Sequence, residues 1–153
     1  LLSTKILDSY ATIIRQAYFV DFEIKAHNAI PKGMTEEELS EMYFKSLKEQ
    51  YGTSINLQKN FKYEWSYIPH IFHTPFYCYA YSFGELLSLA LYANYKKQGK
   101  EFIPKLKHIL KAGGSVDPEK LLKEQGFNIR KEEFWQQGFK VIENWIKEFK
   151  TLL

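Results

Sequence analysis

The sequence contains very little cysteine, and this excludes a disulfide framework. Cys78 is the only cysteine among 153 residues. Because one thiol cannot form a disulfide within the chain, the fold must rely on a packed core, which a chain of this length can supply. A lone thiol fits a reducing compartment. We therefore expect a cytoplasmic location.

Long apolar runs and concentrated positive charge are also missing. No run of about eighteen apolar residues occurs, which argues against a membrane-spanning helix. The net charge is only +3, and lysines alternate with glutamates along the chain. A nucleic-acid-binding surface usually concentrates its basic residues. We therefore expect neither a membrane nor a nucleic acid as a partner.

No stretch shows the alternation of apolar and polar residues that a surface strand requires. Apolar residues recur instead at steps of three and four, which is typical of helices. The fold class predicted is all-α, as one helical domain over residues 1–153. About six helices are expected, at residues 4–29, 35–50, 75–98, 101–112, 117–125 and 131–150, with a loop at 53–68.

Capping residues support two of these boundaries. Thr35 precedes Glu38 by three residues, which predicts a capping box. Asp117 followed by a proline predicts a second N-terminus. Pro75 would begin the long helix 75–98, whose apolar side chains lie on all sides. Such a helix is expected to be central and buried.

The strongest zinc signature, His-Glu-x-x-His on a helix, does not occur in the chain. His70 and His73 are three residues apart, but Pro69 and Pro75 bracket them and no carboxylate lies between them. These residues are better explained as structural or substrate-facing. We therefore expect no metal site within this chain.

Other candidate groups favour structural roles. Glu23 and His27 are four residues apart on the first helix, which favours a hydrogen-bonded or ionic pair. Cys78 lies between tyrosines and has no base at a suitable spacing, so it is expected in the core. Ser82 lacks the G-x-S-x-G context of a hydrolase nucleophile.

Aromatic residues are abundant, and they gather with two histidines in "YIPHIFHTPFYCYAYSFG", residues 67–84. Helical spacing places Tyr77 and Tyr81 on one face and Tyr79 on the opposite face. A buried tyrosine hydroxyl needs a hydrogen-bond partner, and in an enzyme this partner can be a substrate carbonyl. The residues alone leave both interpretations open, an aromatic core and an active site.

Four motifs in order carry a resemblance to a known family. They are "IIRQAYFVDFEIKAH", then "TEEEL", then "EWSYIPHIFHTPFYCYAYSFGELLSLALY", then "LKAGGSVDPEKLLKEQGFNI". This series resembles the C-terminal part of the oligoendopeptidase F branch of the zinc oligopeptidases, which are relatives of thimet oligopeptidase. The resemblance covers nearly the whole chain.

The resemblance implies the helical C-terminal portion of a zincin-type catalytic domain that hydrolyses short peptides. Zinc would be held upstream by a His-Glu-x-x-His helix and a later glutamate, so the full-length enzyme would carry zinc and this chain would bind none. The remainder of the catalytic domain would be its partner. Alone, the chain should be inactive.

The resemblance also implies residue roles. His70 matches a histidine that hydrogen-bonds bound peptide, and Tyr79 matches a tyrosine that stabilises the tetrahedral oxyanion. His73, Tyr77 and Tyr81 are further candidates for substrate binding.

The alternative is a non-catalytic all-α interaction module. It predicts that His70 and Tyr79 are buried and satisfied within the chain. The peptidase hypothesis predicts instead that the first helix and the long aromatic helix leave apolar surface exposed.

Overall fold

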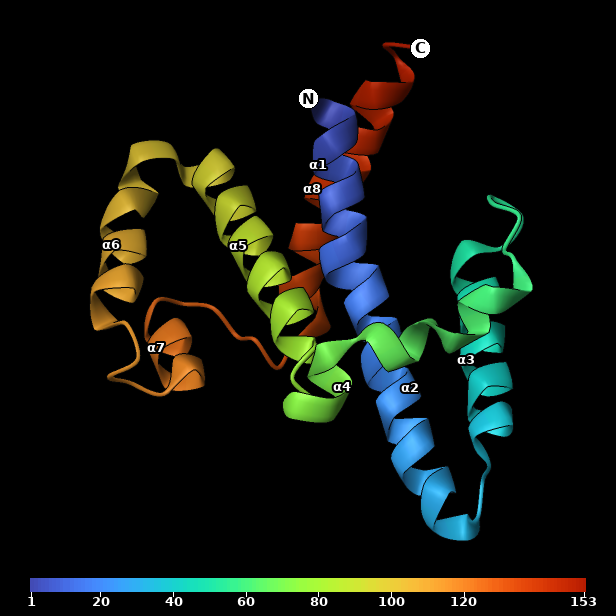
Figure 1. The fold of residues 1–153 in the computed structure, drawn as a ribbon. Coiled ribbons are helices and arrows are strands. Elements are labelled where there is room, and N and C mark those ends of the chain that lie inside the picture. Colours follow the sequence, from blue (N-terminus) through green and yellow to red (C-terminus); the bar gives the residue numbers. More distant parts are fainter. The chain divides into compact units, whose positions relative to one another are not determined.

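The computed structural model describes residues 1–153 and contains helices but no strand, which confirms the predicted all-α fold (Figure 1). The chain divides into two compact units, Asp8–Phe83 and a second unit of Leu1–Leu7 with Gly84–Leu153. The helical segments are α1 Leu2–Ser9, η1 Tyr10–Arg15, α2 Gln16–Ala29, η2 Ile30–Lys32, α3 Glu36–Tyr51, η3 Lys59–Tyr67, α4 Pro69–His73, α5 Tyr79–Gln98, η4 Gly99–Phe102, α6 Ile103–Ala112, α7 Pro118–Glu124 and α8 Glu132–Lys150.

The first predicted helix is continuous from α1 to α2, but η1 within it is a π-helical turn. Such a turn inserts one residue and shifts the backbone hydrogen bonds to an i→i+5 spacing. The Ser82 hydroxyl donates to the carbonyl oxygen of Ile13 at 2.9 Å and lies 3.4 Å from that of Thr12. The start of α5 is thereby attached to the π-helical turn.

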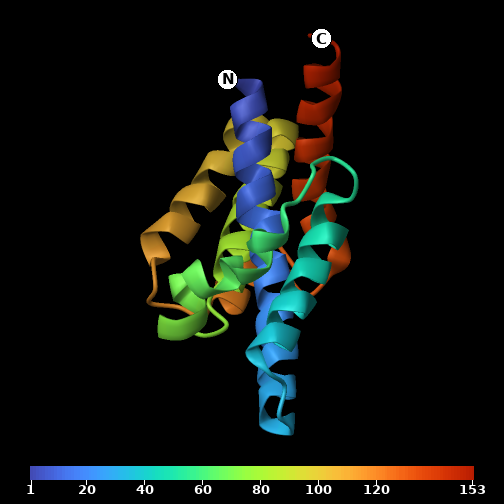
Figure 2. The same cartoon turned by 45° about the vertical axis from the view of Figure 1, so that its right-hand side comes forward.

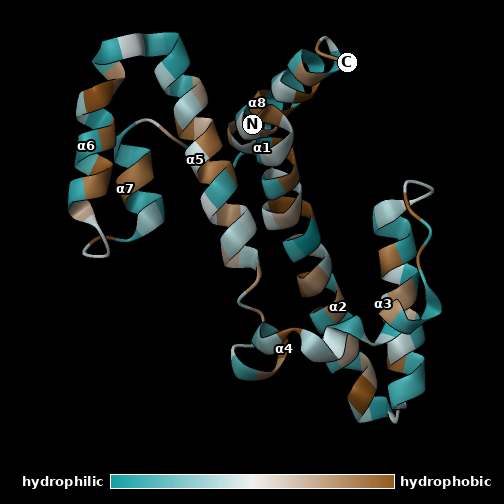
Figure 3. Cartoon of the chain, turned by 45° about the horizontal axis from the view of Figure 1, so that its top comes forward, coloured by the Kyte–Doolittle hydropathy of each residue, from teal (hydrophilic) through white to brown (hydrophobic).

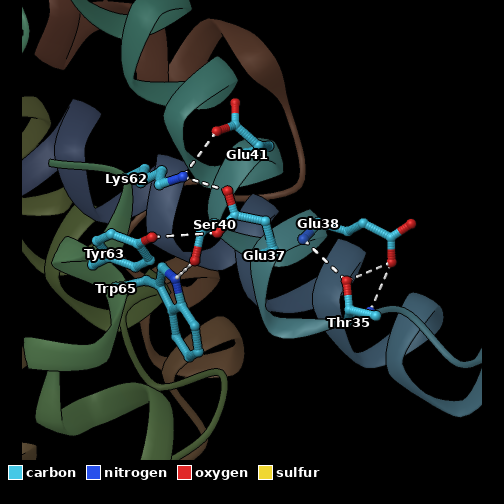
Figure 4. Close-up of polar contacts among 8 residues, drawn as sticks. All are labelled: Thr35, Glu37, Glu38, Ser40, Glu41, Lys62, Tyr63 and Trp65. Carbon is cyan, nitrogen blue, oxygen red and sulfur yellow. Dashed lines mark hydrogen bonds and ion pairs between the residues drawn. The ribbon is translucent and has the colours of Figure 1, made fainter. Parts of the chain in front are cut away.

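The predicted capping box at the start of α3 is confirmed. Thr35 Oγ1 accepts the backbone N–H of Glu38, and Glu38 Oε2 accepts the backbone N–H of Thr35 at 2.8 Å (Figure 4). Three glutamates in the first turn of α3 also complement the positive end of the helix dipole. The helix therefore begins at the residue that the sequence indicates.

The core of Asp8–Phe83 lies between α2 and α3, which run side by side in both ribbon views (Figures 1 and 2). The Phe22 ring packs edge-on against Tyr43 at 5.0 Å and tilted against Trp65 at 6.0 Å. Trp65 Nε1 donates to Ser40 Oγ at 3.2 Å, which attaches η3 to α3 (Figure 4). The buried members of this core are Phe19, Phe22, Ala26, Leu39, Tyr43, Phe44, Leu47 and Cys78.

The segment predicted as a loop at 53–68 is helical over most of its length. Lys59–Tyr67 forms a 3₁₀ helix. Lys62 forms ion pairs with Glu37 and Glu41 of α3, and the Tyr63 hydroxyl donates to Glu37 (Figure 4). The sequence shows no helical period here because contacts to α3, rather than an apolar stripe, hold the segment.

The long helix begins later than predicted and is more exposed. α5 begins at Tyr79, and residues 74–78 form a turn in which Phe76 has a φ of +61°. Leu89, Ala90 and Leu91 are buried. The expectation of a helix buried all round is wrong, since four of its tyrosines are exposed, namely Tyr79, Tyr81, Tyr92 and Tyr95.

The second unit has a core of its own, formed by α5, α6, α7, α8 and the segments that connect them. Its buried members are Ala90, Leu91, Phe102, Leu122, Phe127 and Phe134. Figure 3 shows apolar residues spaced along α6 and α7, which pack against each other. Asp117 caps α7 as predicted, because its Oδ1 accepts the Lys120 N–H at 2.9 Å. None of the helices has the combination of length and apolar character that a membrane span requires.

Candidate functional site

The predicted site residues lie on α4, on the turn at 74–78 and on the first turn of α5, all within Asp8–Phe83. His70 Nε2 and the Tyr81 hydroxyl are 2.8 Å apart, which is a hydrogen bond. Pro69 begins α4, so His70 is presented in its first turn. The bond therefore connects α4 to α5 across the turn.

Three rings assemble around this hydrogen bond. The Tyr77 ring lies parallel to the His70 ring, with centroids 6.2 Å apart and an interplanar angle of 6°. Tyr81 meets both rings nearly at right angles, each at 5.5 Å. Tyr77 and Tyr81 are exposed. The cluster of His70, Tyr77 and Tyr81 thus presents an imidazole and two phenol hydroxyls that can donate to or accept from a peptide backbone.

Tyr79 and His73 lie outside this cluster. Tyr79 is 60% exposed, and neither side chain makes a hydrogen bond or ring contact. Helical phase predicts that Tyr79 is separated from Tyr77 and Tyr81, and the structure separates them, although Tyr77 precedes the helix. The free Tyr79 hydroxyl is available to a ligand.

Glu23 is fully buried, and its partner differs from the predicted one. The pairing expected with His27 is wrong: Glu23 Oε1 accepts the backbone N–H of Phe76 at 2.8 Å. The His27 ring packs instead against the Phe76 ring, with centroids 4.8 Å apart. The sequence spacing identifies neighbours on one helix, whereas the actual partner is 53 residues away.

Cys78 and Ser82, whose side chains could act as nucleophiles, have structural roles, as the sequence indicates. Cys78 is completely buried in the core. Burial and, to a smaller degree, the nearby Glu23 carboxylate raise the pKa of the Cys78 thiol, which favours the unreactive protonated form. The Ser82 hydroxyl is engaged by the carbonyl oxygen of Ile13. Neither side chain is placed as a nucleophile.

A polar network beside the core supports η3, the segment that leads into α4. Arg15 Nη2 lies 2.5 Å from Glu64 Oε1, and Arg15 Nη1 donates to the Tyr51 hydroxyl at 3.1 Å. The Tyr43 hydroxyl donates to Glu64 Oε2 at 2.7 Å, and burial together with this carboxylate raises the pKa of Tyr43. The sequence does not single out Glu64, because no local pattern relates it to Arg15.

A metal-binding arrangement is not present within residues 1–153. No group of three or more His, Cys, Asp or Glu side chains converges closely enough to hold a metal ion. The cluster of His70, Tyr77 and Tyr81 contains only one residue of these types. These residues therefore do not fit the zinc ion that the family resemblance implies.

Comparison with known proteins gives one family for nearly the whole chain. Residues 1–141 match the description of peptidase family M3. Oligopeptidase PepF of Bacillus subtilis is 31% identical over 144 residues, which are 93% of this chain and 21% of that protein. An oligoendopeptidase F homolog of Borreliella burgdorferi is 34% identical over 152 residues, which are 98% of this chain and 24% of that protein.

Solved structures give the same result. A putative peptidase from Chlamydophila abortus superposes with a TM-score of 0.87 at 31% identity, over 99% of this chain and 26% of that one. Oligoendopeptidase-F from Enterococcus faecium superposes with a TM-score of 0.88 at 29% identity, over 99% of this chain and 29% of that one. The chain thus spans about a quarter of the length of the proteins that it matches.

Proposed function

The chain belongs to peptidase family M3, and we propose that it forms one wall of the substrate channel in a zinc metalloendopeptidase that hydrolyses short peptides. Its relatives carry the names oligopeptidase PepF and oligoendopeptidase F, in agreement with the resemblance drawn from the sequence. The observation that carries the proposal is the cluster of His70, Tyr77 and Tyr81, in which both tyrosines are exposed, together with the free hydroxyl of the exposed Tyr79.

The proposed roles follow from the groups that each side chain presents. His70 hydrogen-bonds the backbone of a bound peptide, and Tyr77, Tyr81 and His73 provide further contacts to it. Tyr79 donates its hydroxyl hydrogen to the oxyanion that develops when the peptide carbonyl is attacked. A donor placed there stabilises the transition state more than the ground state. All these groups bind and orient; none supplies a nucleophile.

The proposal divides the active site between this chain and residues outside 1–153. Because no ligand set converges here, the zinc ion would be held by residues on the remainder of the catalytic domain. That remainder would also cover the exposed aromatic surface, which includes Tyr67 at 84% and Phe72 at 54% exposure. One domain spanning 1–153 and a cytoplasmic location remain part of the proposal.

Exposure also separates the proposal from a non-catalytic interaction module. The module hypothesis expects His70 and Tyr79 to be buried and to have their hydrogen bonds satisfied within the chain. His70 Nε2 does have a partner within the chain, the Tyr81 hydroxyl. Tyr79 is instead 60% exposed and makes no hydrogen bond. This observation supports the peptidase hypothesis.

A native-source experiment tests the proposal. The polypeptide that contains residues 1–153 is purified, its intact mass is measured, and its hydrolysis of a fluorescence-quenched oligopeptide is assayed. We expect a mass well above 18.1 kDa together with peptide cleavage. A species of about 18.1 kDa without cleavage would favour the interaction module instead.

Substitution then tests the site within the longer protein. His70→Ala should lower kcat/KM by about tenfold or more, because it removes a hydrogen bond to the peptide. His108→Ala is the matched control, since His108 is exposed on α6 and makes no hydrogen bond. Equal activity of the two variants would remove His70 from the site.

A further inference from the structure

Glu23 is a charged residue in an otherwise apolar environment. It lies on α2 with 0% exposure, and Phe22 and Ala26 on the same helix belong to the surrounding core. Burying a carboxylate is costly unless hydrogen bonds replace its hydration. Only one of its oxygens has a partner: Oε1 accepts the Phe76 N–H, and Oε2 has no hydrogen bond. A leucine would fill such a position at lower cost, so the structure suggests a specific task for this carboxylate.

The residue that donates a hydrogen bond to Glu23 indicates what this carboxylate does. Phe76 has a φ of +61° and is the only residue other than glycine with a positive φ in the chain. The left-handed conformation is unfavourable for a residue with a β-carbon and persists only where its surroundings hold it. Two contacts from α2 hold Phe76: the Glu23 carboxylate binds its N–H, and the His27 ring packs against its ring.

The position of Phe76 in this turn matters because Tyr77 is the next residue. The chain leaves α4 at His73 and enters α5 at Tyr79, so only residues 74–78 set the path between them. The conformation of Phe76 determines the direction in which Tyr77 leaves the turn. In the observed conformation, the Tyr77 ring stacks on His70 and meets Tyr81 edge-on.

We propose that Glu23 is a positioning residue for the peptide-binding cluster: by accepting the Phe76 N–H, it holds the left-handed turn that places Tyr77 and Tyr81 against His70. This inference rests on the proposed function, in which the cluster binds the peptide. Glu23 does not touch the peptide itself, because it is fully buried. What matters is the length of the Glu23 side chain, which brings Oε1 within hydrogen-bond distance of the Phe76 amide, rather than its charge.

Two conservative variants of the longer protein separate the effect of side-chain length from the effect of charge. Glu23→Gln keeps an oxygen at the same distance from the Phe76 N–H and removes the charge. Glu23→Asp keeps the charge and withdraws the oxygen by one methylene. Loss of one hydrogen bond typically costs up to about tenfold. We therefore expect E23D to raise KM for an oligopeptide by about tenfold with a smaller change in kcat, and E23Q to remain within about threefold of the parent protein.

The opposite order, with E23D unchanged and E23Q impaired, would overturn the proposal, because the charge would then be the property that matters. Equal KM values for E23D, E23Q and the parent protein would also overturn it. The unfolding temperature of each variant is measured alongside. Both variants preserve most of the side-chain volume, and a cooperative unfolding transition for each shows that the comparison is made between folded proteins.

A double-mutant cycle shows whether Glu23 acts through the cluster. Tyr77→Ala removes the ring that the turn positions. If Glu23 works through Tyr77, the rise in KM caused by E23D shrinks in the Y77A background, because the two residues act as one unit. A rise in KM of the same size in both backgrounds would show that Glu23 acts elsewhere, and the proposal would fail.

A crystal structure of the E23D variant separates this inference from the proposed function. If the parent protein does not cleave peptides, the proposed function fails, yet the conformation of the turn can still be observed. Departure of Phe76 from a positive φ, with loss of the stacking of Tyr77 on His70, supports the positioning role. An unchanged turn overturns it, whatever the activity.

Discussion

Arg15 and Glu64 form the ion pair that joins the first helix to η3, with Arg15 Nη2 2.5 Å from Glu64 Oε1. Both side chains are only about a quarter exposed, so solvent screens the pair less than a surface pair. Their position matters for the site because the chain passes from η3 into α4 and then to His70.

Arg15→Ala should therefore destabilise the protein by about 1–3 kcal/mol, because it leaves a partly buried carboxylate with only the Tyr43 hydroxyl as partner. The measurement is the free energy of unfolding from denaturant titration. Arg15→Lys is the matched control and should lower the free energy of unfolding by less, because it keeps the positive charge. It should still be less stable than the parent protein, because lysine cannot contact both Glu64 and Tyr51 with two separate nitrogens. Wild-type stability of Arg15→Ala would contradict this role for the pair.

The free hydroxyl of Tyr79 gives a direct test of the proposed oxyanion contact. Tyr79→Phe in the longer protein should lower turnover by about 10²-fold, by analogy with the loss of one oxyanion donor. Its ring is kept, and the hydroxyl makes no hydrogen bond within the chain, so the unfolding temperature should not change. Tyr67→Phe is the control, since Tyr67 is 84% exposed and is not assigned to the site. Unchanged turnover of Tyr79→Phe would remove this residue from the mechanism.

Gly138 allows α8 to approach α5 closely. A β-carbon there would lie 2.9 Å from the carbonyl oxygen of Leu86, and this oxygen belongs to the backbone and cannot rotate away. Gly138→Ala should cost about 1–3 kcal/mol of stability through this overlap, even though alanine favours helix. Gly84→Ala is the matched control: it lies on α5 with nothing within 4 Å of the added carbon, and it should stabilise by about 0.5–1 kcal/mol. The experiment compares the unfolding midpoints, and the same sign for both variants would contradict the argument.

The capping box at the start of α3 should make stability depend on pH. The Thr35 backbone N–H, and then its hydroxyl, donate to Glu38 and lower the pKa of this carboxylate in the folded state. A lowered pKa contributes stability above the unfolded-state pKa, and this contribution is lost as the pH falls through the folded-state pKa.

Glu38→Gln cannot titrate, so its unfolding temperature should fall less than that of the parent when the pH is lowered from neutral to about pH 3. Glu36→Gln removes a charge from the same turn without touching the capping box and serves as the control. If both variants follow the acid response of the parent protein, the capping box does not set this dependence.

The elements that the sequence predicts correctly are those governed by neighbours in the chain. The capping box of Thr35 and Glu38 and the cap at Asp117 depend on residues three positions apart, so local spacing identifies them. The separation of Tyr79 from Tyr81 follows from helical phase within α5. The gathering of His70 with Tyr77 and Tyr81 depends on the turn at 74–78, which the sequence does not predict, and the roles of these residues stay predictions.

The features that the sequence does not predict depend on distant partners. The 3₁₀ helix at Lys59–Tyr67 is held by ion pairs from Lys62 to α3, more than twenty residues earlier. Proline suggests a helix start at residue 75, yet the Glu23 carboxylate accepts a hydrogen bond from the Phe76 N–H and stabilises a turn there instead. No window of consecutive residues contains the information for either feature.

The π-helical turn at Tyr10–Arg15 has a consequence for how this region can vary. One inserted residue rotates everything after it by about 100° about the helix axis, relative to a regular α-helix. Deleting a single residue within Tyr10–Arg15 would restore regular geometry and change which backbone carbonyl oxygen faces Ser82, whose hydroxyl now donates to that of Ile13. Aligned relatives that share this contact should therefore keep the length of the turn even where its residues differ.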